Sequence, residues 1–201
     1  MTINDRIKKL DIILPQAKLP VGSYVATKIT GNLLFISGQI SIDENGELIK
    51  GKVGKDLSVD DGYNAAKRCG LSIISQAKEA CDGDLSKIKS CIKLTGFVNS
   101  TDDFTEQPKV INGASDIIAK IFSEKGMHTR AAVSTNSLPL GVAVEVDVVI
   151  DPQPKVVVVR LRGRSLGSSI DDQKLVCRRW RGLASFCRSL FGVLVEVDVD
   201  S

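Results

Sequence analysis

The stretch RAAVSTNSLPLGVAVEVDVVI, residues 130–150, contains two β-forming runs separated by a turn. The first run is Arg130–Asn136. In the second, Val142–Ile150, branched apolar residues occupy every other position. Alternation of this kind places one set of side chains on each face of a strand. It predicts a strand with a buried valine face. The opposite face would carry Ala143, Glu145, Asp147 and Val149.

The segment Leu138–Gly141 joins these two strands and is typical of a turn. If the strands pair through it, Glu145 lies in the same region as Arg130. The two residues could then form a structural salt bridge, or Arg130 could hold a carboxylate while Glu145 handles a proton. Arg130 stands out because residues 1–151 contain only two other arginines, Arg6 in an N-terminal segment and Arg68 in a predicted helix.

The sequence before residue 130 predicts three more strands and two helices. Tyr24–Thr30 and Leu33–Ile42 flank Gly31-Asn32 as the two arms of a hairpin. A helix with Ser58 as its N-cap runs to about Ala80. The remaining elements are a strand over Cys91–Val98, with Ile92, Leu94 and Val98 on one side, and a helix that begins between Thr101 and Pro108 and stops near Gly126.

The resulting order, ββαβαββ, predicts an α+β fold in which two helices cover one face of a mixed sheet. The other face carries both polar and apolar side chains. We therefore expect other subunits to complete it.

Composition sets the class of protein. The 201 residues suit one domain with an appendage. No run reaches the ~18 apolar residues of a membrane span, and the start lacks a signal peptide's apolar centre, so we expect a soluble cytoplasmic protein. The five cysteines form no C-x-x-C pair and predict reduced, mostly buried thiols rather than disulfides or a zinc site.

Two further features argue against particular site types. His128 is the only histidine, which excludes multi-histidine metal sites, and we interpret it as a loop residue just before a strand. The segment GELIKGKV, residues 46–53, has the glycine spacing of a phosphate-binding loop. It lacks the Ser or Thr after the lysine, and no helix opens directly behind it, so we reject that interpretation.

Several motifs follow one another along residues 1–150. They are PVGSYV at 20–25, LFISGQ at 34–39, LTGFVNSTDDF at 94–104, FTEQPKVINGASD at 104–116 and the stretch from Arg130 to Val146. In this order they resemble the Rid family of reactive intermediate deaminases, also known as YjgF-like or L-PSP endoribonuclease-like proteins, and in particular a branch of longer members. One departure is Ala132, which stands where many members have a cysteine.

The resemblance implies a chorismate-mutase-like subunit that assembles as a homotrimer with three clefts between neighbouring subunits. In such a cleft the residue matching Arg130 binds the carboxylate of a 2-imino or 2-enamino acid, which water hydrolyses to a 2-keto acid and ammonia. Glu145 would orient water or transfer a proton, and no metal or organic cofactor is implied. The residues implied to line the cleft are Tyr24, Ser37, Gly38, Phe104 and Asn112.

Two other functions stay open at this point. Members of the family have also been described as RNA-binding proteins, endoribonucleases or translation inhibitors, although residues 1–151 carry a net charge of only −1 and offer no basic patch. The third possibility is a non-catalytic trimer that binds small carboxylates.

The last fifty residues, 152–201, differ from the preceding domain, residues 1–151. They begin at Pro152-Gln-Pro154 and hold seven arginines and a net charge of +4. We interpret them as an extension foreign to the fold that packs poorly. The alternative is a basic arm for RNA or an acidic partner, with contacts at Arg178, Arg179, Trp180 and Arg181.

Overall fold

The computed structural model describes residues 1–20, 22–153, 157–161, 174–177 and 195–197. The chain divides into two compact units, Met1–Gln153 and Pro154–Ser201. In the second unit, the described strands form a small antiparallel sheet of order β7-β6-β8. Their bounds are Val157–Leu161 for β6, Lys174–Cys177 for β7 and Val195–Val197 for β8. The predictions of poor packing and of a basic arm at residues 178–181 fall largely or wholly outside the described residues.

The first unit has the predicted order ββαβαββ, preceded by a short helix that the sequence analysis did not anticipate. Its helices are α1 (Ile3–Lys9), α2 (Val59–Ala80) and α3 (Gln107–Phe122). Its strands are β1 (Thr27–Thr30), β2 (Leu33–Ile40), β3 (Ile88–Asn99), β4 (Thr129–Thr135) and β5 (Val144–Pro152). Short 3-10 turns occupy Leu85–Lys87, Ser123–Gly126 and Pro139–Gly141.

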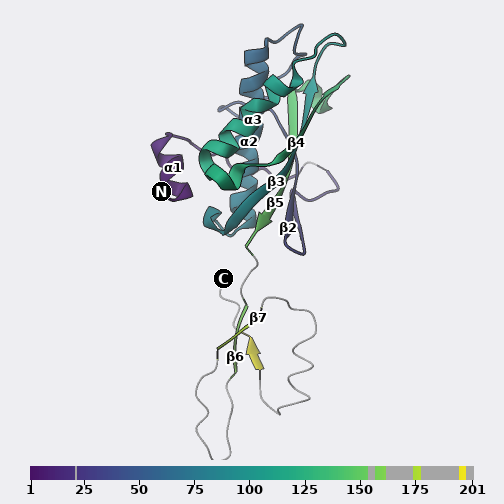
Figure 1. Ribbon diagram of the computed structural model, residues 1–201. Coiled ribbons are helices and arrows are strands. Elements are labelled where there is room, and N and C mark those ends of the chain that lie inside the picture. Colours follow the sequence, from purple (N-terminus) through teal and green to yellow (C-terminus); the bar gives the residue numbers. More distant parts are fainter. Residues whose placement is uncertain (21, 154–156, 162–173, 178–194, 198–201) are drawn as a thin grey trace, which may run out of the picture. The chain divides into compact units, whose positions relative to one another are not determined.

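The five strands form one mixed sheet, as predicted. Their order is β1-β2-β5-β3-β4, and among these pairs only β3 with β4 is parallel. Helices α2 and α3 pack together over one face of this sheet (Figure 1). The other face, called the open face below, has no helix of this unit against it (Figure 1).

Helix α2 begins where the sequence places it, because Ser58 forms a capping box. The Ser58 hydroxyl accepts a hydrogen bond from the Asp61 backbone N–H at 3.1 Å, and the Asp61 carboxylate accepts one from the Ser58 N–H at 3.0 Å. The predicted inner face is buried at Ala66, Cys69, Ile73 and Ala77. The helix therefore rests on the sheet through small and apolar side chains.

A glycine sets the close approach of the two long helices. A Cβ atom on Gly113 of α3 would lie 1.9 Å from the Tyr63 carbonyl oxygen of α2. No larger residue fits at this crossing without separating the helices.

Strand β5 has the alternating burial that its sequence predicts. Val144, Val146, Val148 and Ile150 are buried, whereas Glu145, Asp147 and Val149 on the open face are half-buried. In β3 the prediction fails at Ile92, whose side chain is 40% exposed. The register against β5 shifts between Cys91 and Lys93, so Cys91 takes the inward position.

The pairing expected for β4 and β5 is wrong. Strand β4 pairs in parallel with β3, and β5 lies between β2 and β3. The reason is the burial of apolar side chains. Strand β5 buries every second side chain and therefore takes a central position in the sheet. No residue of β4 is fully buried, and that strand lies at the edge. The turn at Pro139–Gly141 therefore joins strands that are not neighbours.

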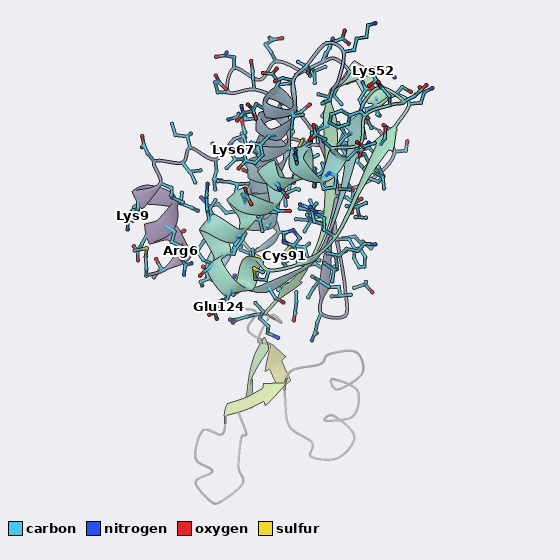
Figure 2. All side chains as sticks on the ribbon, turned by 45° about the horizontal axis from the view of Figure 1, so that its top comes forward. Arg6, Lys9, Lys52, Lys67, Cys91 and Glu124 are labelled. Atoms are coloured by element: carbon cyan, nitrogen blue, oxygen red, sulfur yellow. The ribbon has the colours of Figure 1, made fainter. Side chains whose placement is uncertain are left out.

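Helix α1 is attached to the core at two points. Its Ile3 side chain is buried, and Arg6 donates a hydrogen bond from Nη1 to the Ile121 carbonyl oxygen near the end of α3, at 3.0 Å. Figure 2 shows Arg6 on the side of α1 that is turned towards α3. A capping box between Thr2 and Asp5 starts the helix.

The predicted state of the cysteines is confirmed for those in the first unit. Cys69, Cys81 and Cys91 are buried and form no disulfide. Burial raises the pKa of the Cys91 thiol to about 12 and that of Cys69 well above its ordinary value, so neither is a nucleophile at neutral pH. In the described part of the chain, no helix is both long and apolar enough to span a bilayer.

Candidate functional site

Arg130 lies near the start of the edge strand β4 and faces the helices. Its register partner on β3 is the buried Leu94. Its Nη1 atom donates two hydrogen bonds to α3, one to Asn112 Oδ1 at 2.8 Å and one to Ser115 Oγ at 3.1 Å. These contacts fix one end of the guanidinium. Among the described residues, Nε and Nη2 have no hydrogen-bond partner, so that edge is free for a planar anion.

The hydrogen bonds continue beyond Ser115 to His128. The two side chains meet at 3.0 Å between Ser115 Oγ and His128 Nε2, and His128 Nδ1 lies 2.6 Å from the Gly126 carbonyl oxygen. The interpretation of His128 as a plain loop residue therefore missed its link to Arg130. The spacing of Asn112 and Ser115, three residues apart on one helix face, was the signal available in the sequence.

Glu145 lies on β5 and faces the open side of the sheet, next to the β2 strand. A Cβ atom on Gly38 would lie 1.9 Å from Glu145 Oε1, so the glycine leaves the space that the carboxylate occupies. Burial, and then the nearby Asp147 charge, raises the pKa of Glu145 above its ordinary value. A carboxyl group with a raised pKa is suited to giving up and taking back a proton.

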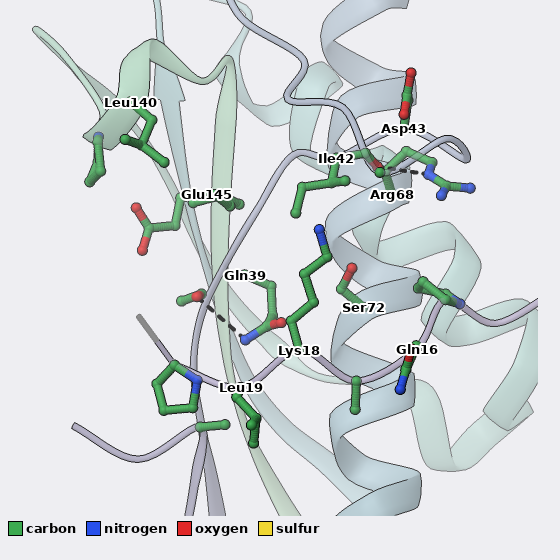
Figure 3. A pocket seen from close by; sticks show the side chains of 18 of the residues that line it. Gln16, Lys18, Leu19, Gln39, Ile42, Asp43, Arg68, Ser72, Leu140 and Glu145 are labelled. Carbon is green, nitrogen blue, oxygen red and sulfur yellow. Dashed lines mark hydrogen bonds between the residues drawn. The ribbon is translucent and has the colours of Figure 1, made fainter. Parts of the chain in front are cut away.

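An open pocket of about 990 Å³ lies beside Glu145. Tyr24 and Gly38, which the family resemblance places at a cleft between subunits, line this pocket of the single chain together with residues 15–20. Figure 3 shows Glu145 and Leu140 on one side of the pocket and Lys18, Arg68 and Ser72 on the other. Arg68 is held there by a hydrogen bond from Nε to the Ile42 carbonyl oxygen at 2.9 Å.

The other predicted residues do not line this pocket. The Ser37 hydroxyl donates to the Val25 carbonyl oxygen at 2.7 Å and so fixes the backbone beside Tyr24. Phe104 packs against the core after β3. Asn112 lies with Arg130 on the α3 side. The chain therefore presents two separate groups. The Arg130 group is Asn112, Ser115, His128 and Arg130, and the Glu145 pocket includes Tyr24 and Gly38.

Arg130 and Glu145 are not brought together within the chain. Arg130 shares a sheet face with Leu94, whereas Glu145 is registered with Phe97 on the open face. The expectation that a turn aligns them is wrong because β3 separates their strands. The segment that follows β4 is held by Lys52, whose Nζ atom donates a hydrogen bond to the Asn136 carbonyl oxygen at 2.8 Å.

Within the described residues, no group of three or more His, Cys, Asp or Glu side chains could hold a metal ion. The contacts proposed for RNA lie at residues 178–181, outside the described part of the chain.

Comparison with known proteins agrees with this architecture. Residues 4–150 match the family model described as "YjgF/chorismate mutase-like, putative endoribonuclease". Protein TCP17 of Trypanosoma cruzi is 42% identical over 146 residues, which is 72% of this chain and 91% of that protein. A RutC family protein of Pyrococcus horikoshii is 30% identical over 139 residues, covering 69% of this chain and 94% of its own length.

A solved structure is similar over the same region. It is a protein of unknown function from Agrobacterium tumefaciens, with a TM-score of 0.70 and 44% identity over 75% of this chain and 92% of that one. The resemblance found in the motifs and the chorismate-mutase-like α+β fold are thus confirmed. Across most of its length, this chain belongs to the YjgF/RidA family, also called the RutC or L-PSP family.

Proposed function

We propose that this chain hydrolyses 2-imino and 2-enamino acids to 2-keto acids and ammonia, in clefts between the subunits of a homotrimer. The observation that carries the proposal is the Nε–Nη2 edge of Arg130, which no described residue hydrogen-bonds, while two hydrogen bonds on Nη1 hold the guanidinium in place. This edge matches the two oxygens of a carboxylate. Family membership supports the reaction class.

The cleft must combine two subunits if Arg130 and Glu145 act on one substrate. Arg130 lies at the sheet edge, and Glu145 lies on the open face. The open face also carries Phe35 and Val133, which are 41% and 44% exposed in the single chain. Burying these side chains against a second copy is favourable, and it would place the β4 edge of one subunit near the Glu145 pocket of the next.

The chemistry requires little beyond positioning. With the carboxylate held by Arg130, a water molecule adds to the C=N carbon, and Glu145 accepts a proton from that water. Glu145 passes this proton to the nitrogen, which gives a carbinolamine. It then takes the proton of the new hydroxyl group and passes it to the amine nitrogen, so that the C–N bond breaks, the C=O bond forms and ammonia leaves. The imine is already electrophilic, so orientation and one proton carrier supply the rate. The raised pKa of Glu145 suits this exchange.

The test generates the imine in place. An amino-acid oxidase releases 2-imino acids, and their decay is followed by trapping with semicarbazide, with and without the protein. We expect faster decay with the wild-type chain, loss of the effect in Arg130→Ala and a partial loss in Arg130→Lys, which keeps the charge but not the two parallel donors. Lys9→Ala, which removes an exposed charge on helix α1, is the control. Unchanged turnover in Arg130→Ala contradicts the proposal.

The two other functions give different results in the same preparations. A non-catalytic carboxylate-binding trimer would be stabilised by pyruvate without accelerating imine decay. An RNA-binding arm would give salt-sensitive RNA binding that is lost when residues 152–201 are removed.

A further inference from the structure

We propose that Ser115 and His128 are positioning residues that set the orientation of Arg130 and thereby its affinity for the substrate carboxylate. The inference rests on the proposed function of Arg130. It is carried by an unbroken series of hydrogen bonds from Arg130 through Ser115 and His128 to the Gly126 carbonyl oxygen, which we call the relay.

The chemistry of the groups fixes the direction of each hydrogen bond in the relay. The Gly126 carbonyl can only accept, so His128 Nδ1 carries a proton and donates to it at 2.6 Å. In the neutral ring Nε2 is then an acceptor, and the Ser115 hydroxyl donates to it at 3.0 Å. A lone pair of Ser115 Oγ is thereby directed to Arg130 Nη1, which donates to it at 3.1 Å.

Loss of the hydrogen-bond acceptor on His128 would change the hydrogen bonds that the Ser115 hydroxyl makes. Ser115 lies inside helix α3, where a serine hydroxyl readily donates to the carbonyl oxygen four residues earlier. In that arrangement its lone pair no longer needs to face Arg130. Asn112 alone would then hold Nη1, and the guanidinium could turn about that single contact.

The consequence for catalysis is specific. A carboxylate clamp binds the substrate and the transition state alike, so a loosened clamp raises KM and leaves kcat nearly unchanged. A general weakening of the fold would instead lower the amount of active protein and, with it, the apparent kcat. The division between KM and kcat therefore separates a positioning role from a structural one.

The first measurement is the tautomer of His128 in the full-length wild-type protein. Because the chain has a single histidine, its two ring nitrogens give the only imidazole signals in a ¹⁵N NMR spectrum. At a pH where the ring is neutral, the relay requires a protonated Nδ1 and an unprotonated Nε2. The opposite tautomer, with the proton on Nε2, would overturn the proposal.

The second measurement compares two variants that differ only in which ring nitrogen they imitate. In His128→Gln the side-chain oxygen reaches the place of Nε2 and can still accept from Ser115, whereas in His128→Asn the shorter amide can replace only Nδ1. We expect His128→Asn to raise KM for the imino acid, and Kd for pyruvate, about tenfold, with kcat within about twofold. His128→Gln should stay close to wild type.

Ser115→Ala is the third variant to compare. It removes the middle of the relay, so it should raise KM as much as His128→Asn does, and the double variant should be no worse than either single variant. Equal KM values in His128→Asn, His128→Gln and wild type would overturn the proposal, as would additive effects. Failure of the proposed function would show separately, as a wild-type chain that neither turns over imines nor binds pyruvate. The tautomer would then still decide the relay.

Discussion

Arg130 and Glu145 lie on opposite faces of the same sheet, on strands β4 and β5 that are separated by β3. Each has its own supporting group: Asn112 and Ser115 hold the arginine, and Gly38 makes room for the glutamate. Because the two side chains do not meet within one chain, the proposed function requires a site shared between copies.

The negative charge of Glu145 should lower the free energy of unfolding. Burial raises its pKa, so between the ordinary and the raised value the folded chain binds more protons than the unfolded chain. The free energy of unfolding therefore falls as pH rises through that interval and stays lower above it. We expect Glu145→Gln to be more stable than wild type at pH 7 in urea titrations, with the difference shrinking below the ordinary range of a glutamate. The control is Glu124→Gln, at an exposed glutamate. If Glu145→Gln and wild type differed in free energy of unfolding by the same amount at all pH values, this account would be contradicted.

Gly38 should be required for the position of the Glu145 carboxylate. The methyl group of Gly38→Ala would overlap Glu145 Oε1, so the carboxylate must move. We expect kcat for imine hydrolysis to fall about tenfold or more, since small displacements of a catalytic group have effects of this size. In a Glu145→Ala background the same substitution should change kcat little. A full additional loss in that background would show that Gly38 acts by another route.

Arg6 should hold helix α1 against the core. Its charged hydrogen bond to the Ile121 carbonyl oxygen is lost in Arg6→Ala, and we expect about 1 kcal/mol less stability and faster amide hydrogen exchange in residues 3–9. The exposed Lys9 on the same helix is the matched control, since Lys9→Ala removes a charge without a comparable contact. Equal exchange in the two variants would contradict the role of Arg6.

The sequence predicts this fold well where local signals and burial agree. Ser58 marks the start of α2 because it forms a capping box with Asp61, three residues later in the sequence. The residues Val144 to Ile150 alternate in character because one face of β5 is buried. Strand pairing is a different matter. Whether β4 meets β3 or β5 depends on competition for the centre of the sheet, and a local turn such as Leu138–Gly141 carries no information about that competition.

In the candidate site, too, local motifs could be read from the sequence, whereas contacts between distant segments could not. The motifs single out Arg130, Glu145 and Gly38 as candidates, and the structure shows the contacts around Arg130 and Glu145. His128 and Ser115 escaped the sequence analysis because their role depends on a contact between α3 and the residues before β4, thirteen positions apart. Arg68 was likewise placed on a helix, but nothing in its spacing indicates that it lines the Glu145 pocket.

The most direct test of a site shared between copies is complementation between two inactive variants. Arg130→Ala and Glu145→Ala chains are unfolded together, mixed in equal amounts and refolded, and imine hydrolysis is measured against each variant refolded alone. In random mixed trimers about one cleft in four combines an intact Arg130 with an intact Glu145 from the neighbouring copy, so we expect activity near one quarter of wild type. If both residues served a site within one chain, no mixture could restore it, and activity no higher than that of the separate variants would contradict the account.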